Sequence, residues 1–174
     1  MSRSILLSLA LLALPTLASA EVVARHADGF TLRHHAALET TSDDIATALA
    51  NLPKWWDGAH TYSGRSDSLS MILAPGGCWC EALADGKTFE HARVVSVDPA
   101  GKVVMNAPLG PLNGTATRSD LTYTWIPEGR DWRVTLEFVV EGPGLGAAAD
   151  AVDGVMKAGF ERLSRYIATG QPTP

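Results

Sequence analysis

The two cysteines of the chain, its only ones, are the residues best suited to chemistry. Cys78 and Cys80 flank Trp79 and precede Glu81 in the stretch PGGCWCEAL. On a strand, residues two apart face the same side with their Cβ atoms roughly 6–7 Å apart, whereas a disulfide needs about 3.8 Å. Unless a bulge or a break interrupts the strand, this spacing predicts two free thiols, or at most a strained and labile bridge. Free buried thiols then line a pocket as small hydrophobic groups.

The hairpin that follows decides which side chains accompany the thiols. Asp85-Gly86 favours a two-residue type I′ turn, which pairs Cys80 with His91 and Cys78 with Arg93. The face predicted from this register carries Cys78, Cys80, Phe89, His91 and Arg93. Two thiols and an imidazole on one face could bind a soft or borderline metal ion or form a reactive thiol. This metal or thiol site is the alternative to pocket lining, and a turn one residue longer would reverse the faces.

Acid–base chemistry has few candidates in this chain. Those that could face a cavity are Glu81, Glu137, Asp120 and His91. None of them forms a convincing pair from the sequence. His34 and His35 are adjacent on an expected strand, so they face opposite sides and at most one can join a cavity. The motifs of serine hydrolases, zinc proteases, P-loops and dinucleotide-binding folds do not occur.

The elements that must position these residues are mainly strands. The expected strands cover residues 30–40, 68–73, 78–83, 88–97, 102–106, 115–126 and 132–141. Turn residues such as Pro75-Gly76-Gly77 and Pro127-Glu128-Gly129 separate them. Consecutive strands joined by short turns predict an antiparallel meander.

Two helices complete the expected order. The first begins after Thr41 or Ser42, either of which can cap it, and ends at Pro53. The second covers residues 147–169, with apolar side chains at spacings of three and four on one face. A sheet with one apolar face must be covered, and only the second helix is long enough. We therefore expect an α+β fold in which a curved antiparallel sheet of about seven strands wraps round the C-terminal helix and encloses a cavity.

Specific segments in this order resemble the START/SRPBCC superfamily, the helix-grip fold. The segments that carry the resemblance are Leu52-Pro53-Lys54-Trp55-Trp56, Pro75-Gly76-Gly77, Val94-Val95-Ser96-Val97-Asp98-Pro99, Leu121-Thr122-Tyr123-Thr124-Trp125 with Val134-Thr135-Leu136-Glu137, and Phe160-Glu161-Arg162-Leu163. The bacterial branch with polyketide cyclases and homologues of the heat-shock-protein ATPase activator is the most similar. The resemblance implies a single domain over residues 21–170, followed by a disordered tail at 171–174.

The same resemblance implies a cavity for a hydrophobic ligand and no particular reaction or cofactor. The residues expected to line it are Cys78, Cys80, His91, Phe89, Trp55, Trp56, Trp125, Leu109, Val152 and Met156. Large aromatic side chains serve equally as core and as pocket wall, so both readings of the tryptophans stay open.

The start of the chain is typical of an export signal. Arg3, the apolar run at residues 5–14 and the small residues Ala18-Ser19-Ala20 predict cleavage after residue 20. We therefore expect a periplasmic or secreted protein without a membrane-spanning segment after cleavage. The formal net charge is −5 and no Lys/Arg cluster occurs, which makes nucleic acid a poor partner. A monomer or a weak dimer is expected.

Three functions remain open from the sequence. The favoured one is an exported protein that holds a small hydrophobic or lipid-like ligand between sheet and helix. The first alternative is a cyclase- or hydrolase-like enzyme that uses His91 or a cavity carboxylate as a general base. The second alternative is the metal or thiol site built from Cys78, Cys80 and His91.

Overall fold

A computed structural model describes residues 19–174. One antiparallel sheet of eight strands has the order β1-β2-β8-β7-β6-β5-β4-β3. Its strands are β1 Ser19–His26, β2 Gly29–Leu38, β3 Leu69–Met71, β4 Cys78–Ala82, β5 Thr88–Asp98, β6 Lys102–Asn106, β7 Arg118–Glu128 and β8 Asp131–Glu141. The α-helices are α1 Ser42–Ala50, α2 Leu52–Trp55 and α3 Ala149–Thr169. Short 3₁₀ turns cover Gly58–His60, Ser66–Ser68, Gly110–Leu112 and Leu145–Ala148.

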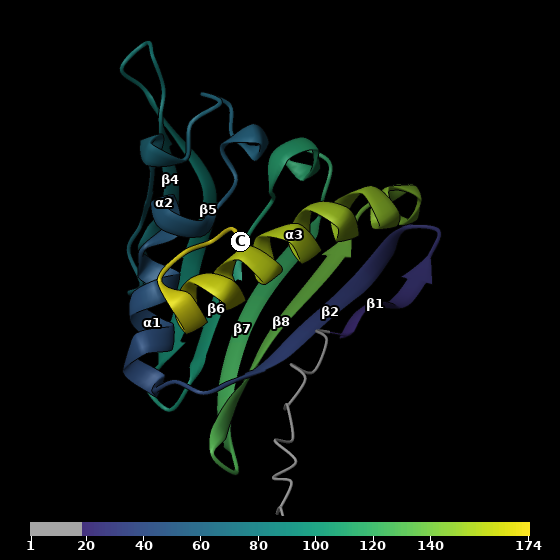
Figure 1. Ribbon diagram of the computed structural model, residues 1–174. Helices are drawn as coiled ribbons and strands as arrows, with labels where there is room; N and C mark the ends of the chain where they lie inside the picture. Colours follow the sequence, from purple (N-terminus) through teal and green to yellow (C-terminus); the bar gives the residue numbers. More distant parts are fainter. Residues whose placement is uncertain (1–18) are drawn as a thin grey trace, which may run out of the picture.

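The predicted architecture is confirmed. The sheet curves, and α3 crosses its concave side (Figure 1). The sheet has one strand more than the seven expected, because β1 adds an edge strand beside β2. Residues 1–18, which hold most of the predicted export signal, lie outside the described residues.

Strict alternation along the central strands produces the core. On β7 and β8 every second side chain is buried toward α3, among them Leu121, Tyr123, Leu136 and Phe138. The matching stripe on α3 includes Met156, Phe160 and Leu163. Successive side chains on a strand face opposite sides, so this pattern gives the sheet one apolar face for the helix to cover.

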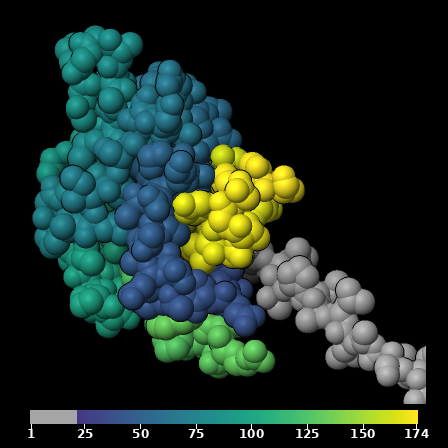
Figure 2. Space-filling view, turned by 60° about the vertical axis from the view of Figure 1, so that its left-hand side comes forward, coloured from purple at the N-terminus to yellow at the C-terminus, as the bar shows by residue number. Residues whose placement is uncertain are grey.

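The first helices close the end of the sheet near the C-terminal end of α3. Thr41 caps α1 by accepting a hydrogen bond from the backbone N–H of Asp44 at 3.2 Å. Arg162 of α3 donates to the carbonyl of Trp55 at 2.7 Å. Figure 2 shows the end of α3 packed directly against this helical segment. The opposite, N-terminal half of α3 is therefore the part that can border a cavity.

Candidate functional site

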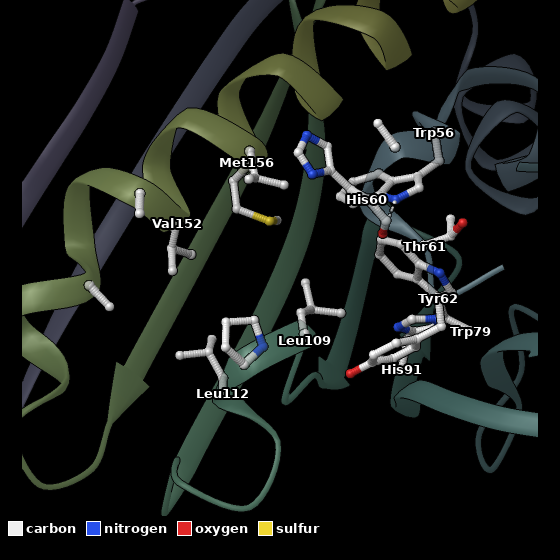
Figure 3. A pocket seen from close by; sticks show the side chains of 16 residues that line it. Trp56, His60, Thr61, Tyr62, Trp79, His91, Leu109, Leu112, Val152 and Met156 are labelled. Carbon is white, nitrogen blue, oxygen red and sulfur yellow. Dashed lines mark hydrogen bonds between the residues drawn. The ribbon is translucent and has the colours of Figure 1, made fainter. Parts of the chain in front are cut away.

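A cavity of about 360 Å³ lies beneath the N-terminal half of α3. Ala148, Val152 and Met156 border it on the helix side, and residues 109–112 form a second side. Residues 59–62 and the aromatic side chains beyond them complete the wall (Figure 3). The volume falls in the range of small-molecule pockets.

The structure brings together half of the side chains that were expected to line the cavity. Those in its wall are Trp56, His91, Leu109, Val152 and Met156. Trp55 is fully buried under α1, where its indole N–H donates to Ala48. Trp125 donates to the hydroxyl of Ser42 and lies at the α1 end of the fold. Phe89 packs beside Tyr62 outside the wall.

The predicted hairpin register is wrong. The loop holds three residues instead of two, because Leu83 pairs with Lys87 and Gly86 adopts the left-handed conformation at φ 80°. Glu81 consequently lies opposite Phe89, and Cys80 opposite Glu90. A bulge then inserts one extra residue on β5, so that Trp79 pairs with Ala92.

The extra residue of this bulge is His91, and it decides which side chains share a face. Phe89, His91 and Ala92 all lie on the inner side of the sheet, whereas Arg93 faces outward. On β4 the inner residues are Trp79 and Glu81. The cysteines therefore lie on the face opposite His91, and the predicted grouping of thiols with the imidazole is wrong.

The expectation of free thiols is also wrong. Cys78 and Cys80 form a disulfide, with their Cα atoms 5.4 Å apart. This separation is within the usual range for disulfides, and the neighbouring bulge provides the local twist that a regular strand lacks. The metal or thiol site of Cys78, Cys80 and His91 is excluded, because both sulfurs are bonded to each other on the outer face.

Glu81 and His91 form a buried pair at the cavity, in which His91 lines the wall and Glu81 lies behind it. The ring Nε2 of His91 lies 2.7 Å from a carboxylate oxygen of Glu81. Glu81 is fully buried and His91 is 5% exposed. The carboxylate also accepts hydrogen bonds from the backbone N–H groups of Tyr62 at 3.1 Å and Ser63 at 2.5 Å. One carboxylate thus joins β4, β5 and the loop at residues 61–63.

The hydrogen bonds decide the charge of this carboxylate. Burial alone raises the pKa of Glu81, but hydrogen bonds from Ser63, His91 and the backbone of Tyr62 outweigh it and lower the pKa below its ordinary value. Glu81 is therefore ionised at neutral pH and acts only as an acceptor.

Aromatic rings surround the pair. Tyr62 stacks on His91 with ring centres 5.6 Å apart and planes 16° apart. The indole rings of Trp56 and Trp79 meet edge to face at 4.6 Å. Trp56 approaches α3 closely at Gly159, where a Cβ atom would lie 2.6 Å from its ring. These rings form one side of the cavity wall.

The remaining acid–base candidates lie away from the cavity. Glu137 binds Arg33, and Asp120 binds Arg118, each half exposed. His34 is buried under α3, with its Nε2 3.1 Å from a carboxylate oxygen of Asp153. Over residues 19–174 no group of three or more His, Cys, Asp and Glu side chains is arranged to hold a metal ion. Among the same residues no helix is long and apolar enough to span a bilayer.

Among the wall residues that sequence reasoning did not identify are His60, Tyr62 and Trp79. His60 and Tyr62 follow Trp55-Trp56 in a short polar segment, HTYSG, and this mixture of aromatic and turn residues was the available signal. The donors that hold Glu81 are backbone N–H groups, which no side-chain pattern reveals.

Comparison with known proteins supports the fold. No family model matches the chain, and no curated protein matches it. A solved structure of an Aha1 dimer from Colwellia psychrerythraea is similar, with a TM-score of 0.60 and 13% identity over 80% of this chain and 97% of that one.

Two proteins from biosynthetic loci are similar to the same degree. DynU16, a protein of the dynemicin biosynthetic locus, has a TM-score of 0.57 and 18% identity over 82% of this chain and 48% of that one. StfQ, a di-domain ARO/CYC of the steffimycin biosynthetic pathway, has a TM-score of 0.56 and 15% identity over 84% of this chain and 52% of that one. The chain thus spans about half the length of each. Together with the sheet and helix described above, these likenesses show the helix-grip fold.

Proposed function

We propose that the protein binds a small, mainly apolar molecule in the cavity beneath α3. The observation that carries the proposal is the composition of the wall. Aliphatic side chains of α3 and the loop at residues 109–112 face the rings of Trp56, Trp79 and Tyr62, and the Glu81–His91 pair is the buried charged feature. Pockets for small molecules have this combination of a mostly apolar lining and a few placed polar groups.

The wall favours a ligand with a flat ring. Rings stack on aromatic side chains with ring centres about 4.5–7 Å apart, and Tyr62, which lines the cavity and is 56% exposed, offers such a surface. A lipid-like chain would fill the same apolar volume without using this surface. Native mass spectrometry of the purified protein distinguishes the two, since it gives the mass of any ligand retained.

A direct test narrows the cavity with one substitution. Val152→Phe adds a ring to the α3 side of the wall, and Val95→Phe adds the same ring at an outer-face position that is 59% exposed. Calorimetric titration with β-naphthol should show at least a tenfold weaker affinity for Val152→Phe than for Val95→Phe, because the ring occupies ligand volume. Equal affinities would place the binding outside the cavity and overturn the proposal.

We further propose that the protein works outside the cytoplasm, as a periplasmic or secreted protein. The Cys78–Cys80 disulfide supports this, because disulfides persist mainly in oxidising compartments. The export signal expected at residues 1–20 supports it independently. Mass spectrometry of the protein from fractionated cells tests both, with a mature N-terminus at Glu21 as the expected result. A full-length, cytoplasmic protein would contradict this proposal.

A second candidate function is proton abstraction from a bound substrate, as in a cyclase- or hydrolase-like enzyme. It is favoured by the position of a histidine backed by a carboxylate in the cavity wall. Kemp elimination of a nitrobenzisoxazole probes such a base, because removal of one carbon-bound proton breaks the N–O bond and releases a coloured phenolate. A rate above buffer that disappears in His91→Phe would support an accessible base. A rate unchanged in that variant would exclude His91 from this role.

A further inference from the structure

The protonation of the Glu81–His91 pair follows from its contacts. Glu81 accepts from three donors, namely the N–H groups of Tyr62 and Ser63 and the ring Nε2 of His91. These donors keep the pKa of Glu81 below its ordinary value, although burial acts in the opposite direction. An ionised carboxylate has no proton to donate. The proton between Glu81 and His91 therefore resides on Nε2.

In the neutral form of the ring, the other nitrogen is consequently an acceptor. In a neutral imidazole the nitrogen that is not protonated carries the lone pair, and the partner of one nitrogen determines the state of the other. Nδ1 of His91 makes no hydrogen bond to any described residue. Unlike Nε1 of Trp79, which is buried from solvent without a partner, Nδ1 of His91 keeps some accessible surface. Since His91 lines the cavity, this lone pair is open to a ligand.

Neighbouring donors do not satisfy this acceptor: those of Trp56 and Thr61 are used elsewhere, and the indole N–H of Trp79 is buried without a partner. The indole N–H of Trp56 donates to the carbonyl of His60 at 3.3 Å. The hydroxyl of Thr61 donates to the carbonyl of Gly58 at 2.8 Å. The Tyr62 ring lies parallel to the imidazole, over its face and not in its plane. Within the described residues, the cavity thus presents an acceptor with no protein donor of its own.

From this geometry we infer that the cavity selects ligands with a hydroxyl group, which donates a hydrogen bond to Nδ1 of His91, and discriminates against the corresponding ethers. The inference rests on the proposed binding function and specifies the ligand class as hydroxylated aromatic rings. A polar site left unpaired by a ligand lowers affinity, whereas a matching hydroxyl restores the bond. The apolar wall supplies most of the contact area, and His91 fixes which edge of the ring enters first.

The test compares β-naphthol with β-naphthyl methyl ether by calorimetric titration. Wild-type protein should bind the naphthol on the order of tenfold more tightly, as expected for a single buried hydrogen bond. In His91→Phe this preference should fall to about one. The ratio of the two preferences removes the difference in water solubility between the probes, because that difference is the same for both proteins.

Nitrogen NMR of the wild-type protein provides a second measurement that needs no variant. In the free protein, the neutral form of His91 should carry its proton on Nε2 and not on Nδ1. Addition of β-naphthol should shift the Nδ1 signal in the direction of an accepted hydrogen bond, whereas the ether should not.

Failures of the two proposals can be told apart. Equal affinities for naphthol and ether, or a neutral His91 protonated on Nδ1, would overturn the hydroxyl selectivity while leaving ligand binding intact. Absence of binding by either probe, together with no retained ligand in native mass spectrometry, would overturn the binding function itself and the selectivity with it.

Discussion

Two buried histidines face carboxylates in this fold, and they differ in what holds the carboxylate. His91 lies 2.7 Å from Glu81, which is fully buried and held by two backbone N–H groups. His34 lies 3.1 Å from Asp153, whose side chain is 22% exposed on α3. Neither ring nitrogen of His34 makes a hydrogen bond of good geometry within the described residues.

The difference shows in the chemistry of each pair. Burial dominates at His34 and lowers its pKa, against the attraction of Asp153 and with the help of Lys157. Its ring stacks on Phe160 with centres 6.1 Å apart, as a packing group of the core would. At the cavity, hydrogen bonds dominate and keep Glu81 ionised. A histidine near a carboxylate becomes a candidate site only where the backbone fixes the carboxylate and a cavity reaches the ring.

The largest expected difference between the pairs is in folding stability. Glu81→Ala leaves His91 and the N–H groups of Tyr62 and Ser63 without their acceptor, and removal of one partner from a buried pair costs roughly 3 kcal/mol or more. The matched variant Asp153→Ala should cost roughly 1 kcal/mol or less, since its carboxylate is partly solvated. Urea denaturation of both variants measures the contrast. Similar losses of stability in the two variants would mean that the backbone hydrogen bonds to Glu81 add nothing to folding stability.

The next largest expected effect comes from the disulfide, which lies beside the Glu81–His91 pair and not beside the His34–Asp153 pair. It closes the strand immediately before Glu81 on the outer face, and no such link lies near His34. For so short a loop the chain-entropy relation gives roughly 1.5 kcal/mol. The double variant Cys78→Ser/Cys80→Ser should lose about that stability. Its NMR spectrum should show altered His91 signals and unchanged His34 signals, and equal changes at both would contradict a local role.

This comparison also shows what the sequence could predict. Apolar alternation and turn residues predict the sheet and the covering helix, and Thr41 was identified as a possible cap. The edge strand β1 was missed, because the export signal accounted for the residues up to 20 and the segment before Phe30 was left unassigned.

The candidate site was predictable only in part, because long-range contacts determine it. Asp85-Gly86 fits a two-residue turn and a three-residue loop equally well, since both accept Gly in the left-handed conformation. The choice decides whether His91 shares a face with the cysteines or with Glu81. Glu81 was a candidate by type, but its partners include backbone groups 18 and 19 residues away in sequence. Local propensity contains no information about such contacts.

The smallest expected difference between the two pairs is in how folding stability depends on pH. The pKa of His34 is lowered from its ordinary value of 6.5, because burial disfavours the imidazolium and Lys157 adds to this, although Asp153 and Glu161 oppose them. Below pH 6.5 the unfolded chain therefore binds a proton at His34 that the folded protein does not, so stability falls as the pH falls through that window.

The slope for this single proton is at most about 1.4 kcal/mol per pH unit. Glu81 contributes a loss of the same sign only below its ordinary value of 4.5, because its folded pKa is lowered. Urea denaturation between about pH 7 and about pH 5 should show that the unfolding free energy of the wild type declines. The slope of this decline should be smaller in His34→Phe, by up to the value given for one proton. Stability that rises toward pH 5 would mean that the attraction of Asp153 outweighs burial at His34.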